Sequence, residues 1–210
     1  VQPLLDPDSP VDDPSQATCA VFYSITNCQQ GLRGVSFGNV LIKQVVEDLG
    51  KEFPRVKQFA TLSPIPGFRN WLQERATSAP GSISPALAAL VAKGDAITAA
   101  EIANAPVALR TELMERCARY LISTDAGVGA QDSVARFHLA NGAMLGRLNW
   151  MGDTSTKGLH RSYGLTVNYE YRISELERNH DGYANHYRVA SSRAFQQLTK
   201  PTRSARRKSG

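Results

Sequence analysis

The sequence predicts an α/β domain, in which a β-sheet is flanked by helices and accompanied by a helical insertion. Residues 19–26 form an apolar run rich in β-branched and aromatic side chains, which is typical of a largely buried strand. Residues 39–53 place their apolar side chains on one face of a helix, and a second apolar stretch follows at residues 56–62. Together these three segments predict a βαβ unit. Later, residues 164–173 alternate apolar and polar side chains with the period of two of a strand.

The segments outside these elements set the expected domain boundaries. Residues 1–16 carry four prolines and four aspartates, which is typical of an extended linker leading into a domain. Residues 200–210 hold five Lys and Arg residues among Ser, Pro, Thr and Gly, which predicts a disordered basic tail. The domain itself is therefore expected over residues 17–199.

The middle of the chain is expected to form the helical insertion, which packs against the sheet. Helices are predicted at residues 68–75 and 85–91. Thr98 begins a capping-box pattern that opens another helix, and Pro106 begins the next one.

After the insertion, we expect a loop at residues 123–131 and a short helix at residues 132–139, with Asp132 near its start. A strand is predicted at residues 144–151, before the alternating strand described above. The polar C-terminal part of the domain predicts only one helix, near residues 191–198.

Composition argues against several classes of function. The three cysteines stand at no metal-ligand spacing and predict reduced thiols, and the acidic residues form no ligand cluster, so we expect no metal. Much of the net charge of +5 comes from the C-terminal tail, where no aromatic residue is interleaved to stack on bases, so we expect no nucleic-acid partner. No apolar run approaches the ~20 residues of a membrane span, so we expect no membrane association.

A glycine-punctuated loop at residues 31–38 leads into the helix expected at residues 39–53. Backbone N–H groups and the dipole at a helix N-terminus suit a phosphate, and glycines let the backbone approach it closely. The glycines alone favour a tight turn between strand and helix, which stays open as the alternative. Arg33 is the better candidate for a phosphate contact, because Lys43 lies well inside the helix, where a charge is more often solvated.

The loop and three later segments carry a resemblance to a known family. Arg33-x-x-Ser36-x-Gly38 resembles the Arg/Gln-x-x-Gly-x-Gly/Ala pyrophosphate loop of the acetyltransferase-like (GNAT) fold, with Ser36 in place of the middle glycine. Together with this loop, three segments resemble the catalytic domain of malonyl-CoA decarboxylases: Ser63-Pro64-Ile65-Pro66-Gly67-Phe68, Phe137-His138-Leu139 and Asn141-Gly142-Ala143. The resemblance runs from about residue 19 to about residue 171 and is loose at residues 76–130.

The resemblance implies a GNAT-like mixed β-sheet and the decarboxylation of malonyl-CoA to acetyl-CoA and CO2. Coenzyme A would be part of the substrate, and no separate cofactor is implied. The family carries a helical domain ahead of the catalytic one, so a missing N-terminal domain is also implied, through which a homo-oligomer could form. Residues 207–210 do not spell the Ser-Lys-Leu peroxisomal address, and we expect a cytoplasmic enzyme, with an organelle left open.

The resemblance also assigns roles that the residues alone do not. Ser63 ends an expected strand before a proline, which is an ordinary structural position, yet it matches the serine that contacts the malonyl carboxylate as proton acceptor. His138, between Phe137 and Leu139, would by itself be structural, yet it matches the proton donor, for which an ionisation at about pH 6–7 is expected. Tyr171 is either a core aromatic residue or a phenol that positions His138 or the malonyl group.

The expected contacts to malonyl-CoA combine this pair with the glycine loop: Arg33, Gly34, Val35, Ser36, Phe37, Gly38, Asn39, Ser63 and His138. Two other functions stay open. An acyl-CoA-dependent N-acyltransferase would share the fold but would need an acceptor-amine site with a general base, for which the sequence shows no pattern. A non-catalytic CoA-binding module would keep the loop but could lose Ser63 or His138, and both are present.

Overall fold

The structure, a computed structural model, describes residues 7–10, 13–23, 37–125 and 129–200. Its centre is a four-stranded mixed sheet with the strand order β1-β2-β6-β5, in which β1 runs parallel to β2 and the other neighbours are antiparallel. The bounds are Cys19–Tyr23 for β1, Gln58–Pro64 for β2, Met144–Asn149 for β5 and Thr166–Glu170 for β6. The predicted α/β class and mixed sheet are thus confirmed.

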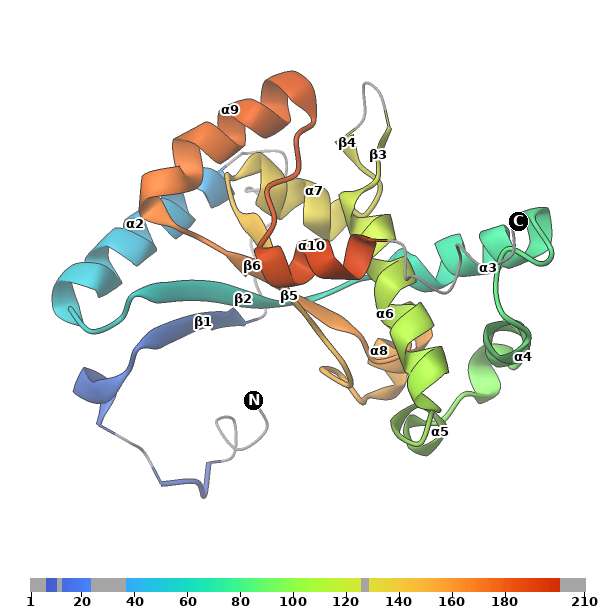
Figure 1. Ribbon diagram of the computed structural model, residues 1–210. Coiled ribbons are helices and arrows are strands. Elements are labelled where there is room, and N and C mark those ends of the chain that lie inside the picture. Colours follow the sequence, from blue (N-terminus) through green and yellow to red (C-terminus); the bar gives the residue numbers. More distant parts are fainter. Residues whose placement is uncertain (1–6, 11–12, 24–36, 126–128, 201–210) are drawn as a thin grey trace.

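Helices surround this sheet. They are α2 (Phe37–Glu52), α3 (Phe68–Ser78), α4 (Pro85–Ala92), α5 (Ala99–Ala103), α6 (Val107–Ile122), α7 (Ser133–Ala140), α8 (Thr156–Ser162), α9 (Leu176–His186) and α10 (Arg193–Thr199). In Figure 1, α2, α7 and α9 lie above the sheet, while α3 to α6 form a group to its right. Short 3-10 turns are η1 (Pro14–Gln16), η3 (Gly94–Ala96) and η4 (Ile173–Glu175).

The predicted βαβ unit is confirmed as β1, α2 and β2. The strand β1 is less buried than its composition predicts, because among the described residues it pairs only with β2. Its outward side chains are exposed, with 47% of Val21 and 56% of Tyr23 accessible to solvent. Residues 24–26, the end of the predicted strand, lie outside the described residues.

The helical insertion forms as predicted, but it reaches the sheet chiefly through other helices. The helix α6 packs against α10 and α4, and α10 in turn packs against β5. Aromatic rings join the insertion to the rest of the core, since Phe68 of α3 lies 5.9 Å from the ring of Tyr120 and 6.3 Å from that of Tyr163. The predicted capping box at Thr98 is present at the start of α5.

The prediction of one helix in the C-terminal part of the domain is wrong, because α9 precedes α10. Only Leu176 and Tyr183 are buried on α9. With so few apolar positions, its sequence shows little of the periodic pattern by which a helix is predicted. Tertiary hydrogen bonds hold it instead: His180 Nδ1 lies 2.6 Å from the carbonyl oxygen of Ala140, and Asn179 donates to that of Gly142. The expected loop at residues 123–131 includes a short hairpin of β3 (Thr124–Asp125) and β4 (Gly129–Ala130).

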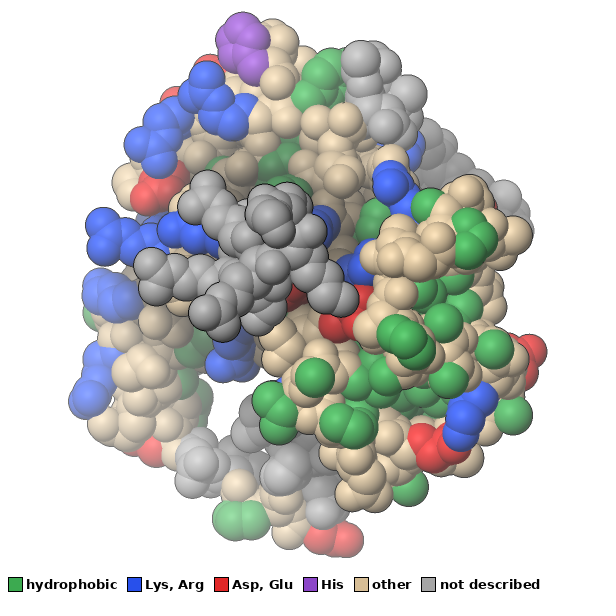
Figure 2. Space-filling view, turned by 45° about the vertical axis from the view of Figure 1, so that its right-hand side comes forward, with side chains coloured by type: hydrophobic (Ala, Val, Ile, Leu, Met, Phe, Trp, Pro, Cys, Tyr) green, Lys and Arg blue, Asp and Glu red, His purple; other side chains and the backbone are tan. Residues whose placement is uncertain are grey.

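The surface of the described residues carries charges of both signs. On the face seen in Figure 2, Lys and Arg side chains gather on the left and hydrophobic side chains on the right. Several cations pair with nearby carboxylates, as Arg116 does with Glu112 at 2.9 Å and Arg172 with Glu170 at 2.9 Å. Such pairs neutralise part of the positive charge locally.

Gly142 lies where the start of α9 packs closely against the turn after α7, and Gly81, in an open loop, serves as its control. Gly142 and Gly81 both have positive φ, +79° and +89°. A Cβ at Gly142 would lie 2.3 Å from the carbonyl oxygen of Leu176, whereas one at Gly81 would meet nothing within 4 Å. We expect Gly81→Ala to cost about 1 kcal/mol of unfolding free energy from backbone strain alone, and Gly142→Ala about 3 kcal/mol or more. Urea denaturation of both variants measures this, and equal losses would contradict the close packing.

Candidate active site

Ser63 and His138 meet in the interior, although 75 residues separate them in sequence. Ser63 stands near the C-terminal end of β2, and His138 lies on α7. Ser63 Oγ lies 3.2 Å from His138 Nε2, and only 5% and 3% of these residues is exposed. The two residues that resemblance singled out are therefore neighbours in a site shielded from water.

Tyr171 adds a third group on the far side of the imidazole. It comes directly after β6, where its backbone N–H donates to the carbonyl of Phe59 at 2.8 Å. Its hydroxyl lies 2.7 Å from His138 Nδ1, so both ring nitrogens are engaged. The three predicted catalytic residues thus form one line, from Ser63 through His138 to Tyr171.

Thr61 extends this line by one more hydroxyl and was not predicted. Its Oγ1 lies 2.8 Å from Ser63 Oγ and accepts the backbone N–H of Tyr169 at 3.2 Å. Thr61 and Ser63 are two residues apart on a strand, so both side chains point to the same face. The period of two, applied to Ser63, was the signal in the sequence that could have found Thr61.

Tyr169 is a second residue that the sequence did not single out. Its ring stacks on the imidazole of His138, with the ring centroids 4.3 Å apart and an angle of 22° between the planes. It is fully buried, and its hydroxyl has no hydrogen-bond partner among the described residues. Tyr169 therefore fixes the orientation of the His138 ring by contact with its face.

One arrangement of protons along this line gives every group a matching partner. In the tautomer with the proton on Nε2, the Tyr171 hydroxyl donates to Nδ1 and the ring donates to Ser63 Oγ. Thr61 Oγ1 accepts the backbone N–H of Tyr169, and in this arrangement its own proton is directed to Ser63 Oγ, although either hydroxyl can donate to the other. In this arrangement Ser63 accepts two hydrogen bonds, and its own O–H is available to a ligand.

Comparison with known proteins adds a separate line of evidence. The sequence profile of the malonyl-CoA decarboxylase C-terminal domain matches residues 1–209. The chain belongs to this family.

Related proteins agree with this assignment. The chain is 38% identical over 208 residues to a protein of Rattus norvegicus named malonyl-CoA decarboxylase, mitochondrial, covering 89% of this chain and 42% of that protein. A protein of the same name from Anser anser anser is 36% identical, with 86% and 40% covered. The chain thus spans less than half the length of these relatives.

Solved structures of malonyl-CoA decarboxylases have the same fold. The structure from Agrobacterium vitis superposes with a TM-score of 0.85 at 42% identity, covering 95% of this chain and 50% of that one. The structure from Rhodopseudomonas palustris gives a TM-score of 0.83 at 40% identity, with 93% and 45% covered. The fold seen here is that of the decarboxylase family.

Burial decides the charge state of His138 in this family member. Removal from water lowers the pKa of His138 from 6.5 to about 3, because the buried site penalises the imidazolium. Burial also raises the pKa of the Tyr171 phenol above its ordinary value. The expectation of a histidine ionisation at about pH 6–7 is therefore corrected for the free protein, in which both groups are neutral at neutral pH.

The predicted phosphate loop lies largely outside the described residues. Nothing is described of residues 33–36, and Phe37, Gly38 and Asn39 are described only as the first turn of α2. The proposed coenzyme A contacts in this loop therefore stay predictions.

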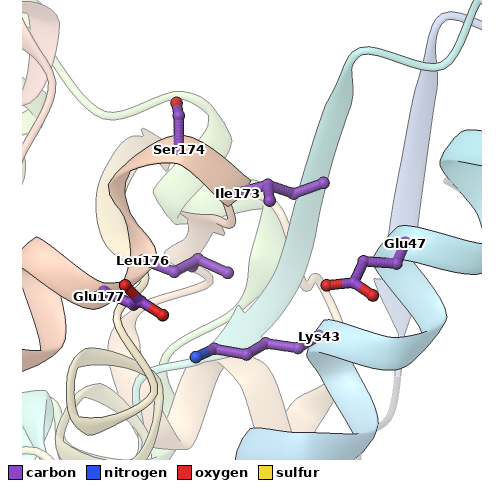
Figure 3. Close-up of a pocket in the computed structure, with 6 residues that line it drawn as sticks. All are labelled: Lys43, Glu47, Ile173, Ser174, Leu176 and Glu177. Carbon is purple, nitrogen blue, oxygen red and sulfur yellow. The ribbon is translucent and has the colours of Figure 1, made fainter.

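A cavity of about 290 Å³ lies between α2 and the segment formed by η4 and the start of α9 (Figure 3). Its lining residues are Lys43, Glu47, Ile173, Ser174, Leu176 and Glu177. Lys43, expected to be a solvated charge, is half-buried here and extends toward Glu177 (Figure 3). Neither Ser63 nor His138 lines this cavity, so it is separate from the candidate site.

Within the described ranges, no group of three or more His, Cys, Asp or Glu residues could hold a metal ion. In the same part of the chain, no helix has the length and apolar character needed to cross a bilayer. The rat and goose relatives are named mitochondrial, and the expected cytoplasmic location of this chain stays a prediction.

The buried His138 makes the unfolding free energy decrease as the pH falls. Its pKa is about 3 in the folded protein and about 6.5 when unfolded, so below pH 6.5 the unfolded state binds the additional proton. This group's contribution to stability is complete above pH 6.5 and is lost as the pH falls toward 3. We expect the unfolding free energy of the wild type to fall more steeply over this range than that of His138→Asn. NMR titration of the ring should show no ionisation above about pH 5, and a midpoint near 6.5 would contradict the assignment.

Proposed function

We propose that this chain decarboxylates malonyl-CoA to acetyl-CoA and CO2. One observation carries the proposal: in a member of the malonyl-CoA decarboxylase family, Ser63, His138 and Tyr171 are joined by hydrogen bonds of 3.2 and 2.7 Å in a buried site. A hydroxyl with an available proton lies beside an imidazole that can deliver one, which is what the two halves of this reaction require.

We assign Ser63 to the malonyl carboxylate. Its O–H, left available by the two hydrogen bonds that Ser63 accepts, would donate to a carboxylate oxygen and orient the bond to be broken. Orienting the scissile C–C bond perpendicular to the thioester carbonyl lets its electron pair enter the carbonyl system. The thioester oxygen then takes the developing charge, so the protein needs only a dry pocket and hydrogen-bond donors.

We assign the proton transfer to His138. A malonyl carboxylate beside the imidazole would raise the pKa of His138 in the complex, since an opposite charge favours the imidazolium. The ring would then take up one proton at Nδ1 as the substrate binds, and the Tyr171 hydroxyl would turn so that its oxygen accepts this N–H. When the C–C bond breaks and CO2 leaves, the electron pair forms the thioester enolate. The Nε2 proton moves to the α-carbon, giving acetyl-CoA and a neutral His138 that keeps its proton on Nδ1. Proton exchange then returns the ring to the Nε2–H form before the next turnover. One proton is consumed, as the overall reaction requires.

Tyr171 has a supporting role in this scheme. In the free site its O–H donates to Nδ1, which leaves the ring proton on Nε2, on the side of Ser63. In the imidazolium its oxygen accepts the Nδ1–H, so the Nε2 proton is still the one that faces Ser63. Because burial raises the pKa of the phenol, Tyr171 keeps its own proton while the imidazole gives one up. Tyr171 therefore orients the acid and does not replace it.

The coenzyme A end would bind at the start of α2. The loop of residues 33–39, with the Arg33 guanidinium, would face the pyrophosphate at the helix N-terminus. This part of the proposal relies on the sequence resemblance.

The decisive experiment is incubation with malonyl-CoA in the absence of any amine acceptor, followed by detection of acetyl-CoA and CO2. Ser63→Ala should lower kcat by roughly 10²–10⁴-fold while leaving acetyl-CoA binding nearly unchanged, because the product lacks the carboxylate. Ser162→Ala is a matched control, since it removes another buried serine hydroxyl, bonded to the carbonyl of Leu165 at 2.6 Å, away from this site.

The outcomes separate the candidate functions. Acetyl-CoA formed without acceptor supports the decarboxylase, and turnover only with an added amine would point to an acyltransferase. Binding of coenzyme A without turnover would point to a binding module. Activity of Ser63→Ala within a few-fold of the wild type would remove Ser63 from the mechanism.

The phosphate loop is tested with Arg33→Ala, which should weaken coenzyme A binding by about 1–3 kcal/mol, as expected for a charge-assisted hydrogen bond. The effect on kcat at saturation should be small, because phosphate contacts are the same in the ground and transition states. Lys43→Ala is the matched control, because it also removes one positive charge, but from the interior of α2 and not from the loop before it. Titration calorimetry compares the two, and equal affinities would place Arg33 outside the site.

A further inference from the structure

The carboxylate of Asp132 joins three separate parts of the fold. Asp132 is the N-cap of α7 and only 1% exposed. Its Oδ1 accepts the backbone N–H groups of Val134 at 3.0 Å and Ala135 at 3.1 Å. Its Oδ2 accepts the backbone N–H of Gly67 and the hydroxyl of Tyr120, both at 3.3 Å. One buried side chain thus ties α7 to the turn after β2 and to α6.

These ties bear directly on the catalytic pair. Gly67 follows Ser63 by four residues, at the turn where β2 gives way to α3, and His138 lies six residues beyond Asp132 on α7. The hydrogen bond from Gly67 to Asp132 therefore links the segment that carries Ser63 to the helix that carries His138. It does so independently of the hydrogen bond between Ser63 and His138 themselves.

The close approach at this link requires glycine for reasons of space. A Cβ at Gly67 would lie 2.2 Å from the hydroxyl oxygen of Tyr120 and 3.6 Å from Oδ2 of Asp132. Any side chain there would push α6 or the turn away from the carboxylate. The backbone of this turn is thus packed directly against Tyr120 and Asp132.

We propose that Asp132 is a positioning residue for the reaction, which holds His138 of α7 in register with Ser63 of β2 through its hydrogen bond to Gly67. This inference rests on the proposed decarboxylase function only for its effect on rate. A displacement of about 1 Å between reacting groups can cost on the order of 10²-fold in rate, so a second link that fixes the two elements has a catalytic consequence.

Helix capping alone does not account for this residue. Capping uses Oδ1 alone, and Ser, Thr or Asn could supply that oxygen without a buried charge. Burial raises the pKa of the Asp132 carboxyl, which means that the site penalises the ionised form. The second oxygen is what distinguishes Asp here, and both of its partners lie outside α7.

Asp132→Asn tests the link and leaves the cap in place. The amide oxygen can still accept from Val134 and Ala135, but the amide NH2 faces the Gly67 N–H with a donor instead of an acceptor. We expect kcat with malonyl-CoA to fall by roughly 10–10²-fold, with little change in the affinity for coenzyme A. Ser84→Ala, which removes the N-cap of α4 away from the site, should destabilise the protein without lowering kcat.

A double-mutant cycle separates positioning from general destabilisation. If Asp132 acts by aligning His138 with Ser63, Asp132→Asn should cost little further rate in a Ser63→Ala background. If the two losses simply multiply, or if Asp132→Asn retains wild-type kcat, the proposal is overturned. Should Asp132→Asn fold poorly, Asp132→Ser keeps a capping oxygen and removes Oδ2, and the same predictions apply to it.

A measurement on the ring itself does not depend on activity. The chain has four histidines, and the ring nitrogen signals of His138 can be identified by their loss in His138→Asn. We expect these signals to shift in Asp132→Asn and to stay unchanged in Ser84→Ala. A wild type without decarboxylase activity would refute the proposed function, whereas unchanged His138 signals in Asp132→Asn would refute the positioning role.

Discussion

The central position of β2 in the sheet is the constraint on which the rest of this structure depends. Pairing with β1 on one side and β6 on the other fixes both edges of β2. The register with β6 places Ser63 opposite Val167, so that Thr61 lies near Tyr169. Three residues that contact the His138 ring, Ser63, Tyr169 and Tyr171, are thereby placed by β2, by β6 and by the residue after β6. The histidine itself arrives from α7, far along the chain.

Burial gives this group of residues its chemical character. In water, an imidazole beside a hydroxyl would exchange protons freely near neutral pH. Here the stacked ring of Tyr169 and the hydrogen bond from Tyr171 surround His138, and the loss of water lowers its pKa to about 3. A neutral imidazole in a dry pocket responds to an arriving anion, because the anion supplies the charge that water would otherwise balance. The low pKa of the free site is thus compatible with an acid that forms only when substrate is bound.

The low dielectric of the buried site also makes the placement of hydrogen-bond donors and acceptors important for stability. Hydrogen bonds in such an interior are strong when satisfied, and a buried polar group left without a partner is costly. Asp132 meets this demand with four donors from three elements, and Thr61 meets it with one donor and one neighbouring hydroxyl. The Tyr169 hydroxyl is one of three buried side-chain groups without a partner among the described residues, and the ring that carries it stacks on His138.

Local sequence patterns determined those helices and strands that depend on interactions between residues close together in the sequence. The spacing of apolar residues predicted β1, α2, β2 and β6, and capping residues predicted the starts of α5 and α7, because helix and strand periods and caps depend on residues a few positions apart. The short motifs around Ser63 and His138 pointed to the family. They did so by resemblance, since each residue taken alone looked structural.

Only the tertiary structure decided how these segments meet. The line from Thr61 to Tyr171, the stacking of Tyr169, the link from Asp132 to Gly67 and the helix α9 all depend on contacts between residues distant in sequence. No local period encodes such contacts. The exposure of β1 and the low pKa of His138 follow from what covers each group, and that is a property of the packed molecule. The sequence alone thus determined which segments form most of the strands and helices and which residues are candidates for the site. Packing decided which of these residues are neighbours, which are exposed to solvent and which are charged.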